Sequence, residues 1–226
     1  MEQDTISKQG EEKFNFNTDI NIIKLKDGRN YSVRIDRHRY FFPDEWKKFL
    51  SSLRESNRFL FDFIFNTGCR FEEAIYTRPN DFDFDRNNVR LWKTKTKAKK
   101  GETHGKPRTI SLSSSFTKRM KKYCDNFKGD EYIFKSSVQA VNQLLKRKLK
   151  ELGIRDYYNF SSHNIRKTHG MYLKALGIDM GEICQRLGHD ANTYIKHYGS
   201  ADIFSDRDMA LIRELMDDLY FRQRRF

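Results

Sequence analysis

Several absences limit what this chain can be. The three cysteines, Cys69, Cys124 and Cys184, lie far apart without metal-ligand spacing, so we expect buried thiols in a reducing compartment. No apolar run is long enough to cross a membrane, and residues 1–12 are polar and lack the apolar segment of a signal peptide. No internal repeat and no linker rich in proline or glycine divides the chain. We therefore expect a soluble cytoplasmic protein with no membrane segment.

Basic side chains outnumber acidic ones by a wide margin. The 226 residues include 44 Lys and Arg against 31 Asp and Glu, which gives a formal net charge of +13. Such an excess destabilises a compact fold by self-repulsion unless an anionic partner offsets it. The composition therefore indicates DNA or RNA as the first candidate partner, with a generic basic surface as the alternative.

Two alternating runs near the N-terminus, residues 20–26 and 29–35, flank Asp27 and Gly28. Asp-Gly between alternating apolar positions is typical of a β-hairpin. Helical spacing of apolar residues takes over after residue 41. We therefore expect an N-terminal extension with a β-hairpin over residues 1–40 and one domain over residues 41–226.

Apolar side chains recur at helical spacing through most of this domain. Pro43 suits a first helical turn, Gly68 interrupts the second helix, and Ser205 with Asp208 resembles a capping box. The expected helices are residues 43–53, 58–66, a segment from 70 onward, 113–123, 138–152, 163–176, 180–187, 194–198 and 205–219.

Residues 89–93 and 108–112 read as two paired strands. The segment between them is basic, with lysines at positions 95, 97, 99, 100 and 106. The expected fold class is therefore mainly α with a small antiparallel β-sheet, that is, α+β.

Five polar side chains stand in short motifs that occur in one order along the chain. Arg70 lies in Thr-Gly-x-Arg-x-x-Glu, His163 and Arg166 form His-x-x-Arg, His189 ends Leu-Gly-His, and Tyr198 follows that histidine by nine residues. A lone arginine is usually a surface charge, a lone histidine is usually structural, and Tyr198 is one of 11 tyrosines. The order and spacing of the whole set, rather than any single member, indicate a shared site.

These side chains suit the exchange of a phosphodiester bond, which needs a nucleophile, positive charge on the nonbridging oxygens and an acid for the leaving alkoxide. Arg70 and Arg166 offer planar forks that bind phosphate oxygens in pairs. Tyr198 is the nucleophile candidate, and a phenol that ionises near pH ~10 needs a base or a local positive field. His163 shares a helix face with Arg166, and His189 is a candidate donor to an oxygen. A lysine between the two strands is the candidate acid.

This ordered set resembles the catalytic domain of the tyrosine recombinases, the phage integrase family, over about residues 41–226. The resemblance implies attack by a tyrosine, a 3′-phosphotyrosyl intermediate, a free 5′-hydroxyl and strand exchange through a Holliday junction, without metal, ATP or another cofactor. It also implies that Arg70 and Arg166 bind the phosphate, that His163 and His189 occupy the two other conserved catalytic positions, and that Tyr198 is the nucleophile.

The resemblance assigns further side chains. Glu73 matches the family's acidic residue after the first arginine and is expected to support the site. Lys95 is the best match for the catalytic lysine, with Lys93 and Lys97 as alternates. Contacts with DNA are expected from Lys93, Lys97, Lys99, Lys100 and Lys167.

The chain also departs from the family pattern. Lys167 stands where many members have histidine, and His169, at a usually apolar position, is interpreted as structural or as a support for the site residues, with DNA contact as the less favoured alternative. Only about 40 residues precede Phe41, where the family usually has a helical core-binding domain. We therefore expect either a fragment or a minimal form that grips DNA with the catalytic half alone.

The predicted function is a site-specific DNA recombinase or integrase. The alternatives are a type IB topoisomerase-like enzyme, which shares the chemistry but relaxes supercoils, and a non-catalytic DNA-binding relic. The expected partner is double-stranded DNA at a specific recombination site. On DNA a homo-tetramer is expected, and without DNA a monomer or weak dimer. A prokaryotic or viral origin and a place at the nucleoid are expected.

The last expected helix carries an apolar stripe between Met209 and Leu219. We expect this stripe either to dock on a neighbouring protomer or to pack on its own domain. Whether the tyrosine acts in its own subunit or in a neighbour stays open at this point.

Overall fold

The computed structural model describes residues 20–24, 30–34, 40–93, 105–198 and 204–219. The chain separates into two compact units, Met1–Arg37 and His38–Phe226, and each is described by itself. In the first unit, β1 (Ile20–Lys24) and β2 (Asn30–Arg34) pair antiparallel. The two arms of the expected hairpin therefore pair as strands, whereas its predicted turn at residues 27–28 lies outside the described residues. The domain boundary at residue 40 stays a prediction.

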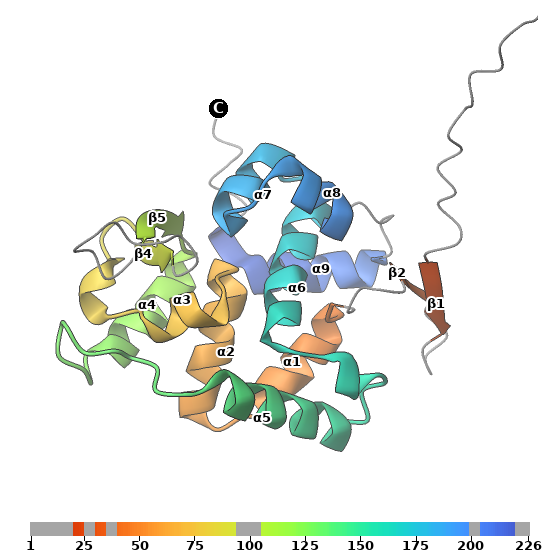
Figure 1. Ribbon diagram of the computed structural model, residues 1–226, viewed down its shortest axis with the longest axis horizontal. Coiled ribbons are helices and arrows are strands. Elements are labelled where there is room, and N and C mark those ends of the chain that lie inside the picture. The colour runs from red at the N-terminus through yellow and green to blue at the C-terminus, as the bar shows by residue number, and fades with distance from the viewer. Residues whose placement is uncertain (1–19, 25–29, 35–39, 94–104, 199–203, 220–226) are drawn as a thin grey trace, which may run out of the picture. The chain divides into compact units, whose positions relative to one another are not determined.

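Helices make up most of the second unit, and a small antiparallel sheet of order β3-β4-β5 lies at one side (Figure 1). This arrangement confirms the expected fold class. In chain order the elements are α1 (Pro43–Ser51), α2 (Glu55–Thr67), α3 (Phe71–Ile75), η1 (Pro79–Asp81), β3 (Phe82–Asp83), β4 (Asn88–Lys93), β5 (Gly105–Ser111), α4 (Ser114–Cys124), α5 (Val138–Glu151), η2 (Tyr157–Asn159), α6 (Ser162–Ala175), α7 (Met180–Leu187), α8 (Ala191–Tyr198), α9 (Asp206–Met216) and η3 (Asp217–Leu219).

Residues at the helix ends explain the boundaries that matter for the site. α2 ends at Gly68, whose φ of +63° lies in the left-handed region that favours glycine. α7 begins after Asp179, whose carboxylate accepts hydrogen bonds from two N–H groups of the first turn, and it ends at Gly188, also with a φ of +63°. The capping box expected for Ser205 and Asp208 is present at the start of α9.

Some boundaries differ from the sequence predictions. α2 begins at Glu55 rather than Arg58, and α8 begins at Ala191 rather than Tyr194. The first turns of both helices are mostly polar or small, so apolar periodicity does not mark them. β3 was not expected, because a strand of two residues is too short for an alternating pattern to reveal.

α2 and α6 lie side by side at the centre of the second unit (Figure 1). Aromatic side chains fill the space around them, and Trp46 of α1 stacks on Phe65 of α2 with ring centroids 4.7 Å apart. The backbone of Phe41 is tied to α6, because its N–H donates to Thr168 Oγ1 at 2.9 Å and its carbonyl accepts from the Tyr172 hydroxyl at 3.1 Å. This core fixes α6 relative to the end of α2.

The sheet brings a basic side chain into the domain. Leu91 of β4 lies opposite Arg108 of β5, and Val89 lies opposite Ile110, so all four side chains share one face. Val89, Leu91 and Ile110 are buried, which identifies this face as the one turned toward the core. Arg108 therefore enters the domain from the sheet.

α9 packs on its own domain, against α1 and α6. Its side chains Ile212 and Met216 are buried, and Lys47 of α1 forms an ion pair with Glu214 at 2.7 Å. Of the two arrangements expected for the apolar stripe, the structure has the one within the domain. No helix in the described parts of the chain has the length and apolar character that a bilayer crossing requires.

The close approach at Gly68 yields a prediction about stability. A Cβ added there would lie 2.6 Å from Cδ2 of His169 and 2.7 Å from Cδ2 of Leu187, whereas a Cβ at Gly153, with a similar φ of +67°, would meet nothing within 4 Å. Both alanine variants bear the cost of a left-handed residue, but only Gly68→Ala also overpacks the core. We expect Gly68→Ala to lower the free energy of unfolding by about 1–3 kcal/mol more than Gly153→Ala. Urea unfolding of both variants measures the difference, and equal losses would contradict the packing at Gly68.

Candidate active site

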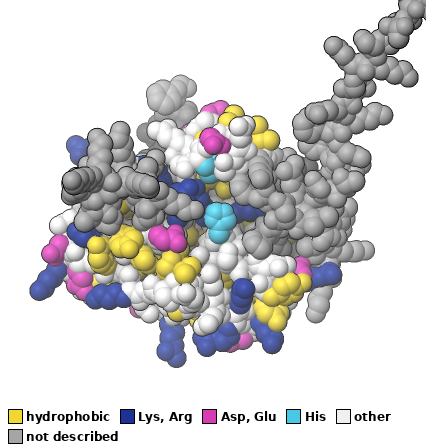
Figure 2. Space-filling model, in the orientation of Figure 1, with side chains coloured by type: hydrophobic (Ala, Val, Ile, Leu, Met, Phe, Trp, Pro, Cys, Tyr) yellow, Lys and Arg dark blue, Asp and Glu magenta, His cyan; other side chains and the backbone are white. Residues whose placement is uncertain are grey.

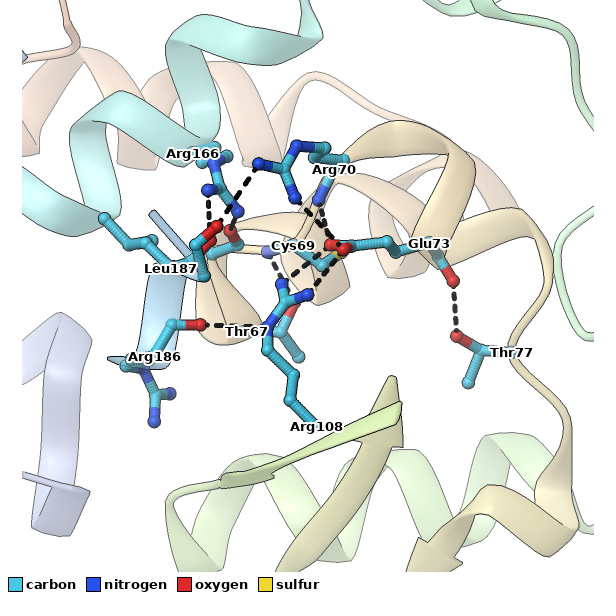
Figure 3. A network of polar contacts seen from close by, with 11 residues as sticks. Thr67, Cys69, Arg70, Glu73, Thr77, Arg108, Arg166, Arg186 and Leu187 are labelled. Carbon is cyan, nitrogen blue, oxygen red and sulfur yellow. Dashed lines mark hydrogen bonds and ion pairs between the residues drawn. The ribbon is translucent and has the colours of Figure 1, made fainter. Parts of the chain in front are cut away.

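The two arginines singled out from the sequence converge on one place (Figure 3). Arg166, on α6, donates from Nη1 to the carbonyl of Gly68 at 2.7 Å and from Nη2 to the carbonyl of Leu187. Arg70 precedes α3, and its Nη2 lies 3.5 Å from the carbonyl of Gly188. Both guanidinium groups therefore point at the C-terminal end of α7. Arg166 is buried, whereas the Arg70 side chain is 25% exposed and is the one that solvent reaches.

A buried carboxylate lies beside these arginines. The Glu73 side chain is 0% exposed, and it accepts hydrogen bonds from both Nη atoms of Arg108, the bond to Nη2 measuring 2.7 Å. It also accepts from the backbone N–H of Arg70 at 2.8 Å and from Arg70 Nη1 at 3.3 Å. Burial alone would raise the pKa of Glu73, but the hydrogen bonds and charge of Arg108 and the Arg70 N–H outweigh it, and the pKa is lowered. Glu73 is therefore ionised, and its carboxylate binds the side chains of both Arg70 and Arg108.

Arg108 was not among the residues predicted from the sequence. Its side chain is 10% exposed, and besides its bonds to Glu73 it donates from Nε to the carbonyl of Arg186 at 3.1 Å. Nothing in the spacing of the motifs points to an arginine on the second strand. The only available signal was indirect, because a buried glutamate needs a cation close to it.

Three consecutive carbonyls at the end of α7 accept hydrogen bonds from three arginine side chains. Arg108 donates to residue 186, Arg166 to residue 187, and Arg70 approaches residue 188 at the limit of hydrogen-bond distance. The last carbonyls of a helix have no partner within the helix and carry its negative partial charge. This helix end therefore binds the three arginine side chains together with the carboxylate of Glu73.

Arg186 is a further arginine that sequence reasoning missed. Its guanidinium donates to the carbonyls of Ser111 at 2.9 Å and Asn66 at 2.8 Å, and from Nε to His169 Nε2 at 2.8 Å. Burial lowers the pKa of Arg186 to about 10, and burial followed by the Arg186 charge holds the pKa of His169 well below its usual range. His169 is fully buried, as its structural interpretation requires, and it links α6 to α7.

Tyr198 lies in the same region, at the end of α8. Its ring is stacked with His189, 5.7 Å between centroids, and a Cβ added at Gly170 of α6 would lie 2.6 Å from its Cε1. Burial raises the pKa of Tyr198 to about 12, while the charge of Arg166 acts in the opposite direction. The phenol is therefore neutral at physiological pH and lies within the electrostatic reach of Arg166.

His189 follows the glycine that ends α7. Its Nδ1 lies 3.3 Å from the Asp190 carbonyl, while its Nε2 is buried and has no hydrogen-bond partner in the described part of the chain. Burial and the charge of Arg166 lower the pKa of His189. Buried nitrogens without a partner are rare, so Nε2 is a candidate for contact with a ligand.

His163 and the lysines between β4 and β5 complete the set of residues predicted for the site. His163 is exposed in the first turn of α6, three residues before Arg166. Figure 2 shows histidine and basic side chains close together on the face in view. Lys95, Lys97, Lys99 and Lys100 lie outside the described residues, as does the side chain of Lys93.

The DNA contact predicted for Lys167 stays a prediction, and the structure places this side chain inside the domain. This residue is only 7% exposed, and its Nζ lies 5.9 Å from the ring centroid of Tyr40. It follows Arg166 on a buried stretch of α6, where periodicity alone does not separate the exposed from the buried positions. A contact of Lys167 with DNA would therefore require this side chain to become more exposed when DNA binds.

The cysteines largely follow the expectation from their spacing. Cys69 and Cys124 are buried, and burial raises the pKa of each to about 12, so both are inert thiols. Cys184 differs from the prediction because it is only half-buried. Within the residues that the structure describes, no group of three or more His, Cys, Asp and Glu side chains is arranged to hold a metal ion.

Residues 39–203 match the family model described as "Phage integrase family". The chain is 25% identical over 166 residues to "Probable integrase/recombinase YoeC" of Bacillus subtilis, a match that covers 70% of this chain and 84% of that protein. It is 23% identical over 136 residues to "Tyrosine recombinase XerA" of Saccharolobus solfataricus, which covers 60% of this chain and 43% of that protein.

Similar solved structures include a XerA recombinase, with a TM-score of 0.56 at 20% identity over 85% of this chain and 68% of that one. The Tn1549 transposon integrase in complex with a circular intermediate DNA has a TM-score of 0.60 at 15% identity over 76% of this chain and 65% of that one. XerH bound to its difH substrate has a TM-score of 0.57 at 18% identity over 79% of this chain and 56% of that one. At these identities the likeness shows the fold, and this chain spans only part of each structure's length.

The buried Glu73–Arg108 pair yields a prediction about stability. Arg108→Met should lower the free energy of unfolding by about 3–5 kcal/mol, because it leaves a buried carboxylate without its main partner. Glu73→Gln combined with Arg108→Met removes both charges and should lose less than the sum of the two single variants. Urea unfolding of the four proteins gives the coupling free energy, and strictly additive losses would contradict the ion pair.

Proposed function

This chain belongs to the phage integrase family, and we propose that it is a site-specific tyrosine recombinase that cuts and rejoins DNA through a covalent phosphotyrosine. The observation that supports this most is the convergence of Arg70 and Arg166 on the end of α7, where His189 follows and stacks with the ring of Tyr198. Two guanidinium groups, a buried phenol and a histidine nitrogen that has no hydrogen-bond partner among the described residues form a set suited to a phosphate. Residues 41–226 would then be the catalytic domain.

In the proposed reaction the Tyr198 oxygen attacks the scissile phosphorus and loses its proton. The bond from phosphorus to the 5′-oxygen breaks, and that oxygen takes up a proton and leaves as a hydroxyl. Arg70 and Arg166 stabilise the charge that builds on the nonbridging oxygens, where preorganised donors contribute most. Lys95 is the proposed acid for the leaving oxygen. In the second step a 5′-hydroxyl loses its proton and attacks the phosphorus, the bond from phosphorus to the Tyr198 oxygen breaks, and the phenol takes up a proton, so the phosphodiester is restored without an external energy source.

The neutral state of Tyr198 sets a requirement on this reaction. With a pKa raised to about 12, the phenol must give up its proton to a base or in a stronger positive field as the phosphate binds. His163 and His189 are the proposed partners for this transfer and for the nonbridging oxygens. When Nδ1 of a neutral His189 donates to the Asp190 carbonyl, its Nε2 is left as an acceptor, and protonation would turn it into a donor.

Double-stranded DNA is the proposed partner. The net charge of +13 favours a polyanion, and two of the similar structures, the Tn1549 integrase and XerH, are complexes with DNA. Because two duplexes must each be cut on both strands, four nucleophiles are required, and we propose a tetramer on DNA. The Tyr198 ring lies against Gly170, one helical turn after Arg166 on α6 of the same chain, which favours cleavage within one subunit. Association with the nucleoid would follow from DNA binding.

The nucleophile is tested with nicked duplexes of randomised sequence. The wild-type chain should form a protein–DNA adduct that resists denaturant, and Tyr198→Phe should form none, because the covalent bond is made by that oxygen. Tyr158→Phe, at a tyrosine that is 58% exposed, is the matched control and should behave as wild type. Absence of any wild-type adduct would favour a non-catalytic DNA-binding protein. Relaxation of supercoils without joining to a second duplex would favour a topoisomerase.

The requirement for the two-pronged guanidinium group of Arg166 is tested by Arg166→Lys. Lysine keeps the charge but cannot donate to the Gly68 and Leu187 carbonyls and to phosphate at once. Loss of one preorganised donor should lower the single-turnover rate of adduct formation about a hundredfold, on the order of 3 kcal/mol. Arg213→Lys, an exposed position on α9, should leave the rate unchanged. A rate for Arg166→Lys within twofold of wild type would remove Arg166 from the reaction.

A further inference from the structure

A lysine of α6 holds the backbone of the tyrosine residue. Lys174 Nζ donates to the carbonyl of Tyr198 at 2.6 Å. Tyr198 is the last residue of α8, so this carbonyl has no acceptor role within the helix and carries part of the helix's negative end. An ammonium group is well suited to that position. The bond joins two helices that also pack on each other.

Lys174 belongs to a regular stripe along α6. Arg166, Gly170 and Lys174 are spaced by four residues, so they lie on one face over about two turns. Each meets a different part of Tyr198. The charge of Arg166 acts on the phenol, the missing side chain of Gly170 leaves room for the ring, and Lys174 binds the backbone carbonyl.

The stripe contacts both the ring of Tyr198 and its backbone carbonyl. Without the Lys174 bond, α8 would still contact α6, but the last turn would be free to rotate and carry the ring away from His189. The position of an attacking oxygen matters steeply, since a misplacement of about 1 Å can cost on the order of a hundredfold in rate. A bond at the backbone of the nucleophile therefore acts on the reaction without touching the phosphate.

We propose that Lys174 is a positioning residue, which clamps the carbonyl of Tyr198 and so keeps the phenol over Gly170 and beside Arg166. The role in catalysis rests on the proposed recombinase function, whereas the clamp itself is a property of the protein without DNA. The competing explanation is that Lys174 only complements the negative end of its own helix, since it stands in the last turn of α6.

The clamp is tested first without DNA. In protein carrying ¹³C-labelled tyrosine, the ring signal of Tyr198 is identified among the 11 tyrosines as the one lost in Tyr198→Phe. Lys174→Met should shift or broaden that signal, because the ring leaves its stacked position on His189. Lys174→Arg, which keeps a donor, should restore it. Lys121→Met removes the same charge from an exposed lysine in the last turn of α4 and should leave it unchanged.

The consequence for the reaction is measured with the nicked duplexes. Lys174→Met should lower the single-turnover rate of adduct formation on the order of 10- to 100-fold, with DNA affinity close to that of Lys121→Met. Lys174→Arg should recover most of the rate.

An unchanged Tyr198 signal in Lys174→Met would overturn the clamp, whether or not the wild-type chain forms an adduct. A changed signal with a rate equal to or above that of the wild type would overturn the positioning role. If the wild-type chain forms no adduct at all, the recombinase proposal fails, and the tyrosine signal still decides whether Lys174 clamps the carbonyl.

Discussion

The structure depends on how several arginines are held close together inside one domain. Arg70, Arg108 and Arg166 would repel one another, and burying a guanidinium without partners is costly. Two features offset this cost. The carboxylate of Glu73 is shared by Arg70 and Arg108, and the carbonyls that end α7 receive one bond from each arginine. The arginines can therefore stay charged and close together, because the Glu73 carboxylate and the negative end of α7 lie beside them.

This arrangement makes the end of α7 the reference point for the elements around it. Gly188 stops the helix in a left-handed conformation, which directs the carbonyls before it toward the arginines. Arg186 then ties the same helix to the end of α2, to β5 and to α6. Gly68 lets the end of α2 approach His169 and Leu187. Elements that are far apart in sequence thus meet through backbone carbonyls rather than through contacts between side chains alone.

The sequence predicted the α-helices, the paired strands β4 and β5 and the convergence of Arg70 with Arg166, because periodicity, capping residues and motif order are local or ordered signals. It did not reveal Arg108 or Arg186, whose partners are carbonyls and a carboxylate from other elements. It also did not reveal that Lys167 is buried, because both sides of α6 are covered there, which one sequence does not disclose. The assignment of Lys95 rests on the family resemblance, and the roles of the site residues await the experiments above.

The binding of three arginine side chains at the C-terminal end of α7 has a consequence for attempts to engineer the domain. Selection for thermal tolerance alone would favour apolar replacement of a whole buried ion pair, since such a replacement is often neutral or stabilising, whereas removal of one partner alone destabilises. Here the same charges orient the groups proposed to act on phosphate, so a more robust scaffold would lose its chemistry. Improvement of heat resistance is better sought at exposed helix surfaces, such as that of α5, than among the guanidinium groups.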